Sequence, residues 1–393
     1  MTRIVVIGGG IAGTATALAL HKAGLDVAVY EAHPDSAEDI GAFLTLASNG
    51  MRALAELDAS DAVTAAGFPL TSLRLLDAEG AEVAHAPLGE AGVPALRYRC
   101  LRRGELNAAL QAEAARRGIP LRHGARLESV TDGPDAVTAH FADGGSATGD
   151  LLIGADGLNS TVRRAAGAAA QPVYAGQRVF YGYTTDAPVS EDTGHITMVR
   201  GSAAAFGYAL SPTGETYWFA RVAGDPLSAD ELAADTPWRD RLVPVLAKDA
   251  TPAAGIVAAS SGRVMVTNAT EMPLGAVWHR GRTLLVGDAA HAASPATGQG
   301  ASMALEDAVV LAKSLRDTPD TAAALALYEA HRRPRVEHNI TVSGQISRGT
   351  HAAPARPGPA APAPRPGEEA LARLLAWDAV LDGGAATLPS GDD

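Results

Sequence analysis

The sequence predicts an α/β protein in which a parallel-sheet domain carries an inserted antiparallel sheet and is followed by a helical region. Three features support this fold class. Residues 4–31 have the pattern of a strand, a glycine-rich turn, a helix and a second strand. Apolar strands at 147–153 and 283–286 are each followed closely by an aspartate, and residues 172–272 form many short alternating runs. Alternating strands and helices are typical of a parallel sheet, whereas closely spaced short strands indicate an antiparallel one.

The first strand, turn and helix have the spacing of a dinucleotide-binding fingerprint. An apolar run at 4–7 is followed by Gly8, Gly10 and Gly13. The first glycine permits a tight turn, the second leaves room for a pyrophosphate, and the third lets the helix pack on the strand. The helix N-terminus favours negative charge, and Glu31, at the end of the second strand, has a carboxylate suited to a ribose diol. The segment therefore predicts nucleotide binding by a Rossmann-like unit.

The N-terminal apolar run has the features of neither a signal peptide nor a membrane span. A signal peptide would need an uninterrupted apolar core and a cleavage site, but residues 8–10 interrupt the run and no convincing site follows. A membrane span would need a longer apolar stretch without glycine breaks. The run is therefore expected to be part of the folded domain.

The composition is that of a globular protein, and it excludes several kinds of partner and site. The 393 residues are 47% hydrophobic and 19% charged, and 32 basic against 44 acidic residues give a net charge of −12. Because there is no basic stripe, nucleic acid is not an expected partner. Cys100 is the only cysteine, so an internal disulfide and a zinc site built on thiolates are excluded, and a cytoplasmic location is favoured.

The region after the fingerprint is expected to contain helices around a hairpin. Arg102 and Arg103 stand near the start of one of these helices, where positive charge opposes the helix dipole. The pair indicates either a solvated basic patch or a bound phosphate. The expected elements are a helix at 49–57 capped by Asn49, strands at 70–76 and 82–86, and a helix at 99–118.

A second short motif, Asp156-Gly157, follows the last of three predicted strands, which lie at 121–130, 136–142 and 147–153. A helix signal comes next, with Asn159 or Ser160 as its cap. Taken alone, an Asp-Gly pair indicates only a turn.

The alternating runs between 172 and 272 predict an antiparallel sheet with one helical insert at 228–248. Half of the aromatic residues of the chain lie in this sheet. Aromatic residues in alternating strands form the core of a sheet more often than they line a pocket. They are Tyr174, Phe180, Tyr181, Tyr183, Phe206, Tyr208, Tyr217, Trp218 and Phe219.

A third motif begins where the strand at 283–286 ends in Gly287-Asp288. An aspartate at the carboxyl end of a parallel strand is placed to accept hydrogen bonds from ligand hydroxyls. After a loop with Pro295, a long helix that begins near Gly298 and continues to 315 offers unpaired N–H groups.

The remaining chain is predicted to be helical around an Ala/Pro-rich linker. Expected are a helix at 325–346 kinked or broken at Pro334, a linker at 352–367 and an amphipathic helix at 368–381. The predicted nucleotide-binding domain comprises 1–70, 95–171 and 270–345, the antiparallel-sheet domain 71–94 and 172–269, and the linker and last helix 346–393.

These three motifs, in this order and with an antiparallel sheet between the second and third, resemble those of the FAD-dependent class A monooxygenases of the para-hydroxybenzoate hydroxylase fold. The resemblance covers about residues 2–345. Arg103, in Arg-Gly-Glu-Leu, is similar to the family arginine that approaches the FAD pyrophosphate. The resemblance implies these FAD-binding residues: Gly8, Gly10, Ile11, Ala12, Gly13, Glu31, Arg103, Leu127, Asp156, Gly157, Gly287, Asp288, Pro295, Gly298, Gln299, Gly300 and Ala301.

The resemblance also implies separate roles along the cofactor. Glu31 would bind the adenosine ribose, Asp288 the ribityl or pyrophosphate region, and residues 295–300 would line the isoalloxazine. Asp156 would serve FAD and the nicotinamide nucleotide together. The chain departs from many relatives at Ala32, where arginine is common, and at Ser302, where asparagine is common.

The implied activity is that of an NAD(P)H- and O2-dependent monooxygenase whose flavin hydroperoxide passes one oxygen atom to the substrate. The helix N-terminus near Gly298 would stabilise the negative charge of the reduced flavin. No catalytic side chain is required, and we expect His291 to be structural rather than a base. NAD(P)H has no binding fold of its own and is expected to dock transiently.

The expected substrate is an aromatic, phenolic or polyketide-like small molecule that is hydroxylated or epoxidised. The enzyme itself is expected to have no membrane span and to be a monomer or a homodimer. The candidate substrate-binding residues are Tyr181, Tyr183, Phe206, Tyr208, Trp218 and Pro295.

Two other functions stay open at this point, and a third is rejected. A flavin-dependent reductase of the geranylgeranyl type would use the same fold, and a non-catalytic protein of this fold would act as a binding module. A flavin-dependent halogenase is rejected, because no Trp-x-Trp-x-Ile-Pro segment is present.

Overall fold

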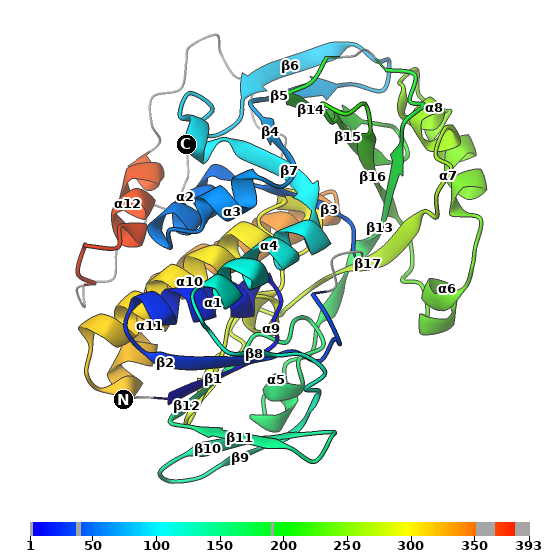
Figure 1. Cartoon of the computed structure of the whole chain (residues 1–393). Helices are drawn as coiled ribbons and strands as arrows, with labels where there is room; N and C mark the ends of the chain where they lie inside the picture. Colours follow the sequence, from blue (N-terminus) through cyan, green and yellow to red (C-terminus); the bar gives the residue numbers. More distant parts are fainter. Residues whose placement is uncertain (1–2, 37–40, 190–191, 351–365, 382–393) are drawn as a thin grey trace.

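The computed structural model describes residues 3–36, 41–189, 192–350 and 366–381. A six-stranded, mostly parallel sheet lies in the lower part of Figure 1, and a seven-stranded, mostly antiparallel sheet lies at its upper right. This arrangement confirms the predicted α/β class with an antiparallel sheet. Within the described residues, no helix has the length and apolar character needed to cross a membrane.

The six-stranded sheet is built on the first apolar strand of the chain. β1 (Arg3–Ile7) pairs in parallel with β12 (Leu151–Gly154) on one side and with β2 (Asp26–Tyr30) on the other. Residues 4–7 are at most 3% exposed, as expected for a parallel sheet covered on both faces. The strand order is β18-β19-β12-β1-β2-β8, completed by β8 (Leu121–Arg122), β18 (His279–Arg280) and β19 (Thr283–Leu285).

Long helices pack together above this sheet (Figure 1). α1 (Ile11–Lys22), rich in alanine and leucine, packs along α10 (Gly300–Asp317), which in turn contacts α11 (Thr321–Ser347). α1 is buried on nearly all sides, which explains why its apolar residues do not form a single stripe. The remaining helices of this part of the molecule are α2 (Ser48–Glu56), α3 (Ser60–Thr64), α4 (Arg103–Arg116), α5 (Thr161–Ala165), α9 (Asp288–His291) and α12 (Pro366–Leu375), with the 3-10 turns η1 (Pro94–Leu96) and η2 (Pro295–Thr297).

The seven-stranded sheet has the order β17-β13-β16-β15-β14-β5-β6. Only the β14–β5 pair is parallel, because β5 arrives from the early part of the chain with its hairpin partner β6. The strands are β5 (Ser72–Leu76), β6 (Glu82–Pro87), β13 (Val173–Thr184), β14 (His195–Arg200), β15 (Ala205–Leu210), β16 (Thr216–Ala223) and β17 (Met265–Glu271).

The two faces of the large sheet have different coverings. Three short helices, α6 (Ala229–Ala233), α7 (Trp238–Leu246) and α8 (Ala253–Ala258), lie along its outer side in Figure 1. Side chains of alternate strand positions pack with α7 and α8 in one core. The intervening positions pack instead against Phe43, which belongs to the other part of the molecule. A site that involves both parts of the molecule must therefore lie on the second face of the sheet, which packs against Phe43.

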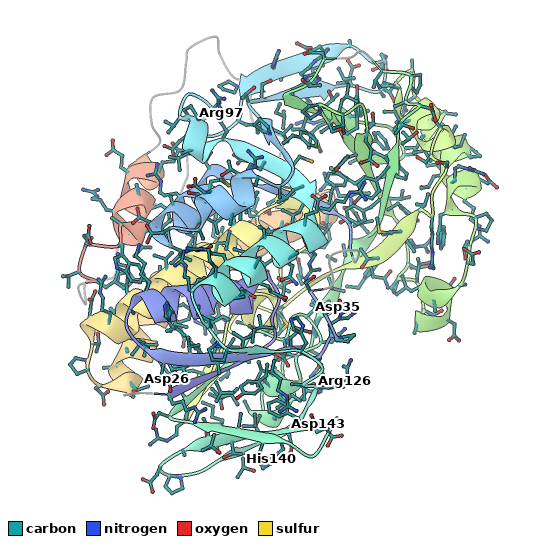
Figure 2. The ribbon with its side chains drawn as sticks, in the orientation of Figure 1. Asp26, Asp35, Arg97, Arg126, His140 and Asp143 are labelled. Carbon is teal, nitrogen blue, oxygen red and sulfur yellow. The ribbon has the colours of Figure 1, made fainter. Side chains whose placement is uncertain are left out.

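Two three-stranded sheets complete the fold. One sheet, ordered β3-β7-β4, contains β3 (Phe43–Leu46), β7 (Tyr98–Arg102) and β4 (Phe68–Leu70). The other contains β9 (Leu127–Asp132), β10 (Val137–Phe141) and β11 (Ser146–Gly149). Figure 2 shows His140 and Asp143 at the lower edge of the molecule, on this second sheet and its adjoining turn.

Several predicted elements have different bounds in the structure. Residues 98–102 form strand β7 rather than the start of a helix, because they pair with both β3 and β4. The predicted strand at 121–130 is two strands, β8 and β9, which belong to different sheets. The predicted helical insert is three separate helices that extend to Ala258.

Three further predictions about helix ends and breaks need correction. Asn49 does not cap α2, because its amide donates instead to Gln299 and Glu306. α11 continues without a break across Pro334. The last helix ends at Leu375, and most of the predicted linker lies outside the described residues.

A buried network of charges joins α10, α11 and the turn after β19. The Asp307 carboxylate accepts from Arg332 Nε at 2.8 Å, pairs with His291 Nε2 at 2.5 Å and accepts from the Gly287 N–H at 3.0 Å. Arg332 also pairs with Glu306 at 2.5 Å. Burial alone would raise the pKa of Asp307, but the charges of His291 and Arg332 hold it at about 2.

We predict that Asp307→Asn lowers the free energy of unfolding by about 3–5 kcal/mol, because it leaves Arg332 buried with one carboxylate fewer. The folded pKa of about 2 lies below the unfolded value of about 3.9. The contribution of Asp307 is therefore complete above pH ~4 and is lost as the pH falls toward 2, so the difference from wild type narrows there. Urea unfolding followed by tryptophan fluorescence measures both effects.

The matched control is Asp240→Asn, whose carboxylate pairs with Arg239 at the surface. This change should alter the unfolding free energy by less than about 0.5 kcal/mol. An equally small effect at Asp307 would contradict the importance of the buried network.

Candidate active site

The three sequence motifs meet at one edge of the parallel sheet. β1, β12 and β19 are neighbours that run in the same direction, so their carboxyl ends lie together. The Ala155 N–H donates to the Ile7 carbonyl at 2.8 Å, and the Val286 N–H donates to the Gly154 carbonyl at 3.0 Å. These bonds hold the segments after the three strands side by side, at the edge where open α/β sheets bind ligands.

The glycine turn (residues 8–13) fits the approach of a phosphate. A Cβ on Gly13 would lie 1.9 Å from the Gly8 carbonyl oxygen, and Gly8 has a φ of +104°, so neither position accepts a side chain. At Gly10 the opposite holds: its φ is −74°, and a Cβ there would have no atom within 4 Å. The space beside Gly10, at the N-terminus of α1, is therefore open for a ligand.

Glu31 is fixed at the end of β2 by two backbone groups. Its carboxylate accepts from the Gly9 N–H at 2.5 Å and from the His33 N–H at 2.6 Å. Each oxygen keeps a lone pair, so ribose hydroxyls can still donate to it. Leu127 begins β9 two residues after Ala125, whose N–H donates to the Glu31 carbonyl.

The structure adds one residue that the sequence reasoning missed. Gln111 of α4 is buried and donates to the Gly9 carbonyl at 2.7 Å, which fixes the glycine turn from the side. The predicted helix at 99–118 gave no reason to select it, because a glutamine in an amphipathic helix is usually exposed.

The Asp156 carboxylate is used within its own turn. It accepts from the Ser160 hydroxyl at 2.5 Å and from the N–H groups of Thr161 and Val162 at 2.7 and 3.0 Å, so it caps α5 together with Ser160. A contact of Asp156 with a nucleotide stays a prediction. The adjacent Gly157 is open, with no atom within 4 Å of a Cβ position.

Two charged side chains at the site have no partner within the described part of the chain. Arg103 is exposed, and Asp288 is partly exposed at the start of α9; neither makes a side-chain hydrogen bond or ion pair there. Arg102, by contrast, pairs with Glu215 at 2.7 Å and lies 4.2 Å from the Tyr183 ring centre. Of the two neighbouring arginines, Arg103 is therefore the one available to a phosphate.

The Pro295 turn (residues 295–300) connects the third motif to α10. The Thr297 side chain donates to Asn339 of α11 at 3.0 Å, and Gly298 has a φ of +66°. α10 then begins at Gly300, where a Cβ would have no neighbour within 4 Å. The N–H groups of its first turn, including that of Ala301, have no partner within the helix.

Aromatic residues of the large sheet form a cluster around Phe43. We call this the aromatic face: Tyr181, Tyr183, Tyr217 and Phe219. Their ring centres lie 5.5–6.2 Å from the Phe43 ring. Burial raises the pKa of Tyr181 to about 12, against the opposing charges of Arg221 and Arg103. Tyr183 also has a buried hydroxyl oxygen that lacks a hydrogen-bond partner in the part of the chain that the structure describes.

Three predicted substrate residues lie on the other face of the sheet. Phe206 and Trp218 are fully buried, and Tyr208 packs against the same core beneath α7 and α8. The Trp218 Nε1–H donates to the Ser260 hydroxyl at 2.8 Å. These residues build the core of the sheet and lie away from the face that packs against Phe43. Alternation alone does not tell which face is covered.

The structure agrees with a structural role for His291. Its ring is 5% exposed and pairs with Asp307 in the buried network, so it does not face an open space.

We predict that Gly10→Val removes FAD without unfolding the protein. A valine fits the φ of −74°, and its Cβ would have no protein atom within 4 Å, but its side chain fills the space beside the N-terminus of α1 where the pyrophosphate would lie. Flavin content is measured from the visible absorbance of the purified protein, and folding from circular dichroism.

Gly262→Val is the control, because Gly262 also has open space around its Cβ position but lies far along the chain from the three motifs. It should keep its flavin. A yellow, fully loaded Gly10→Val protein would show that the pyrophosphate lies elsewhere.

Comparisons with known proteins agree with this geometry. Residues 1–343 match the family model described as an FAD binding domain. The chain is 32% identical over 353 residues to the aurachin C monooxygenase/isomerase of Stigmatella aurantiaca, covering 87% of this chain and 88% of that protein. It is 32% identical over 356 residues to the 3-amino-4-hydroxybenzoate 2-monooxygenase of Streptomyces cremeus, covering 85% of this chain and 84% of the relative. The crystal structure of Klebsiella pneumoniae HpxO complexed with FAD and uric acid is similar with a TM-score of 0.79, at 30% identity and 90% coverage of both chains. The chain therefore belongs to the family of FAD-dependent class A monooxygenases.

Proposed function

We propose that this monooxygenase hydroxylates a planar aromatic substrate held between the Pro295 turn and the aromatic face of the large sheet. The observation that carries the proposal is the closeness of these two parts. Arg221 of β16 lies on the same face as Tyr217 and Phe219, and its Nη1 donates to the Ala296 carbonyl of the turn at 3.3 Å. A ring bound beside the turn would therefore also contact the aromatic residues of the sheet.

We assign the residues at the sheet edge where the three motifs meet to successive parts of FAD. Glu31 would bind the adenosine ribose, the glycine turn and Arg103 the pyrophosphate, and Asp288 the ribityl hydroxyls. The unpaired N–H groups at residues 299–301 would face the pyrimidine edge of the isoalloxazine, where negative charge develops on reduction. FAD, reduced by NAD(P)H, supplies the oxygen-activating chemistry when bound.

The protein contributes position and exclusion of water rather than a nucleophile or a base. The aromatic face is apolar and largely buried, and Tyr181 stays protonated because burial raises its pKa to about 12. A site of this kind holds a flat substrate against the flavin and keeps bulk water away from the reacting atoms. The single cysteine, Cys100, is buried and has its pKa raised by burial, which argues against a thiolate nucleophile.

The names of the relatives support a planar ring as the substrate class. One acts on a hydroxybenzoate, and HpxO binds uric acid. Both are flat rings with polar substituents, so the shared property is the ring and not a particular compound. We expect the enzyme to act in the cytoplasm on such a ring. Hydroxylation is favoured over epoxidation because a relative that is 34% identical is named an FAD-dependent urate hydroxylase.

Turnover under 18O-labelled oxygen gas tests this proposal. With NAD(P)H and a panel of hydroxylated benzoates, quinolines and polyketide-like aromatics, the product should gain one labelled oxygen atom, and the other should leave as water. Mass spectrometry of the product gives the outcome.

The matched reaction without oxygen should give no product. A product that gains only two hydrogen atoms, and forms equally well without oxygen, would instead identify a reductase. The flavin-free Gly10→Val protein provides a second control, since it should be inactive under both gases.

A further inference from the structure

Arg221 is a buried cation whose hydrogen-bonding capacity is mostly unused. It is 8% exposed, and its Nε has no hydrogen-bond partner. The only hydrogen bond of its guanidinium is the 3.3 Å contact with the Ala296 carbonyl, and no ion pair reaches it from the described residues. A guanidinium has five N–H donors, so four of the five are left without an acceptor among the described residues.

The other buried arginines of the described chain are much better satisfied. Arg332 pairs with two carboxylates. Arg99 donates to the carbonyls of three residues. Arg163 donates to two carbonyls at 2.9 and 2.6 Å, although its Nε, like that of Arg221, has no partner among the described residues. Burying a charge without a partner is costly, and such groups occur where a ligand completes them. Among the buried arginines of the described chain, Arg221 therefore makes the fewest hydrogen bonds, and a ligand would complete it.

The position of Arg221 indicates which ligand this is. It stands directly opposite Val179 and two residues after Phe219, whose ring centre lies 5.8 Å from the guanidinium carbon. It thus lies at the end of the aromatic face that touches the Pro295 turn. A planar substrate placed as proposed above would have its ring on Phe219 and Tyr181 and one substituent next to Arg221.

The electrostatics of this corner differ from those of the whole chain. The protein has a net charge of −12, yet the charges that act on Tyr181 are those of two arginines, Arg221 and Arg103. Burial lowers the pKa of Arg221, the direction expected for a cation that lacks a carboxylate partner. If Arg103 serves the pyrophosphate, Arg221 is the positive charge left for the substrate.

We propose that Arg221 binds an anionic substituent of the aromatic substrate, a carboxylate or an ionised hydroxyl, and so selects acidic rings over neutral rings of the same shape. The inference rests on the proposed function, because it assumes that the aromatic face holds the substrate. A carboxylate accepts two parallel hydrogen bonds from a guanidinium, which would also fix the rotation of the ring on the sheet.

The test compares isosteric acids and amides on the FAD-loaded protein. The probes are 4-hydroxybenzoate with 4-hydroxybenzamide, and a hydroxyquinoline carboxylate with its carboxamide. Binding is measured by the change in the visible flavin spectrum, and the same probes are scored for stimulation of NAD(P)H oxidation. The wild type should bind each acid at least about tenfold more tightly than its amide.

Arg221→Met should abolish this preference by weakening the acids about tenfold or more while leaving the amides within about twofold. Arg221→Lys, which keeps the charge but not the two parallel bonds, should restore part of it. Arg178→Met is the control: Arg178 lies on neighbouring β13 with its Nε bonded to the Asp225 carbonyl, and its loss should leave the preference intact.

Two further outcomes separate this inference from its alternatives. If Arg221→Met changes FAD affinity or the flavin reduction potential while the acid preference persists, the guanidinium serves the flavin and the inference is wrong. If no acid perturbs the flavin, or amides bind as well as acids to the wild type, it is also wrong. Labelled-oxygen turnover of a neutral ring by such a protein would still support the proposed function.

Discussion

The site depends on a steric constraint: three backbone turns can meet at one sheet edge only if they carry no side chains where they touch. A Cβ on Gly8 would lie 2.5 Å from the Ala155 carbonyl, and one on Gly287 would lie 2.7 Å from the Ala12 side chain. Real Cβ atoms do not come so close. These glycines therefore join the turns after β1, β12 and β19 into one surface, and the cofactor and substrate regions are arranged around it.

The buried charges maintain this surface from behind. Asp307 accepts from the Gly287 N–H, so the network of Arg332, Glu306 and His291 fixes the turn that follows β19. Arg163 connects the second motif to the third by donating to the Ala289 carbonyl. The same helices that carry these groups hold the Pro295 turn through Thr297 and Asn339. Stability and site geometry are thus provided by one set of contacts.

Local motifs were predictable from the sequence, whereas the contacts between distant segments were not. The spacing of Gly8, Gly10 and Gly13 defines a strand, turn and helix because glycine tolerance and periodicity act over short distances. The same reasoning placed Trp218 and Phe206 in a substrate site, because alternation shows that two faces exist but not which one α7 and α8 cover. Gln111 and Arg221 were not selected as site residues for a related reason. Their roles depend on contacts with Gly9 and Ala296, which lie more than 70 residues away along the chain.

The most direct test of the account is a crystal structure of the protein with bound FAD. The account predicts the pyrophosphate against the N–H groups that follow Gly10, a ribose on Glu31, and the isoalloxazine between the Pro295 turn and the aromatic face, with its pyrimidine edge at residues 299–301. Arg221 should then face the space beside the ring rather than a protein carboxylate. An isoalloxazine bound away from the aromatic face, or a pyrophosphate distant from Gly10, would contradict the account.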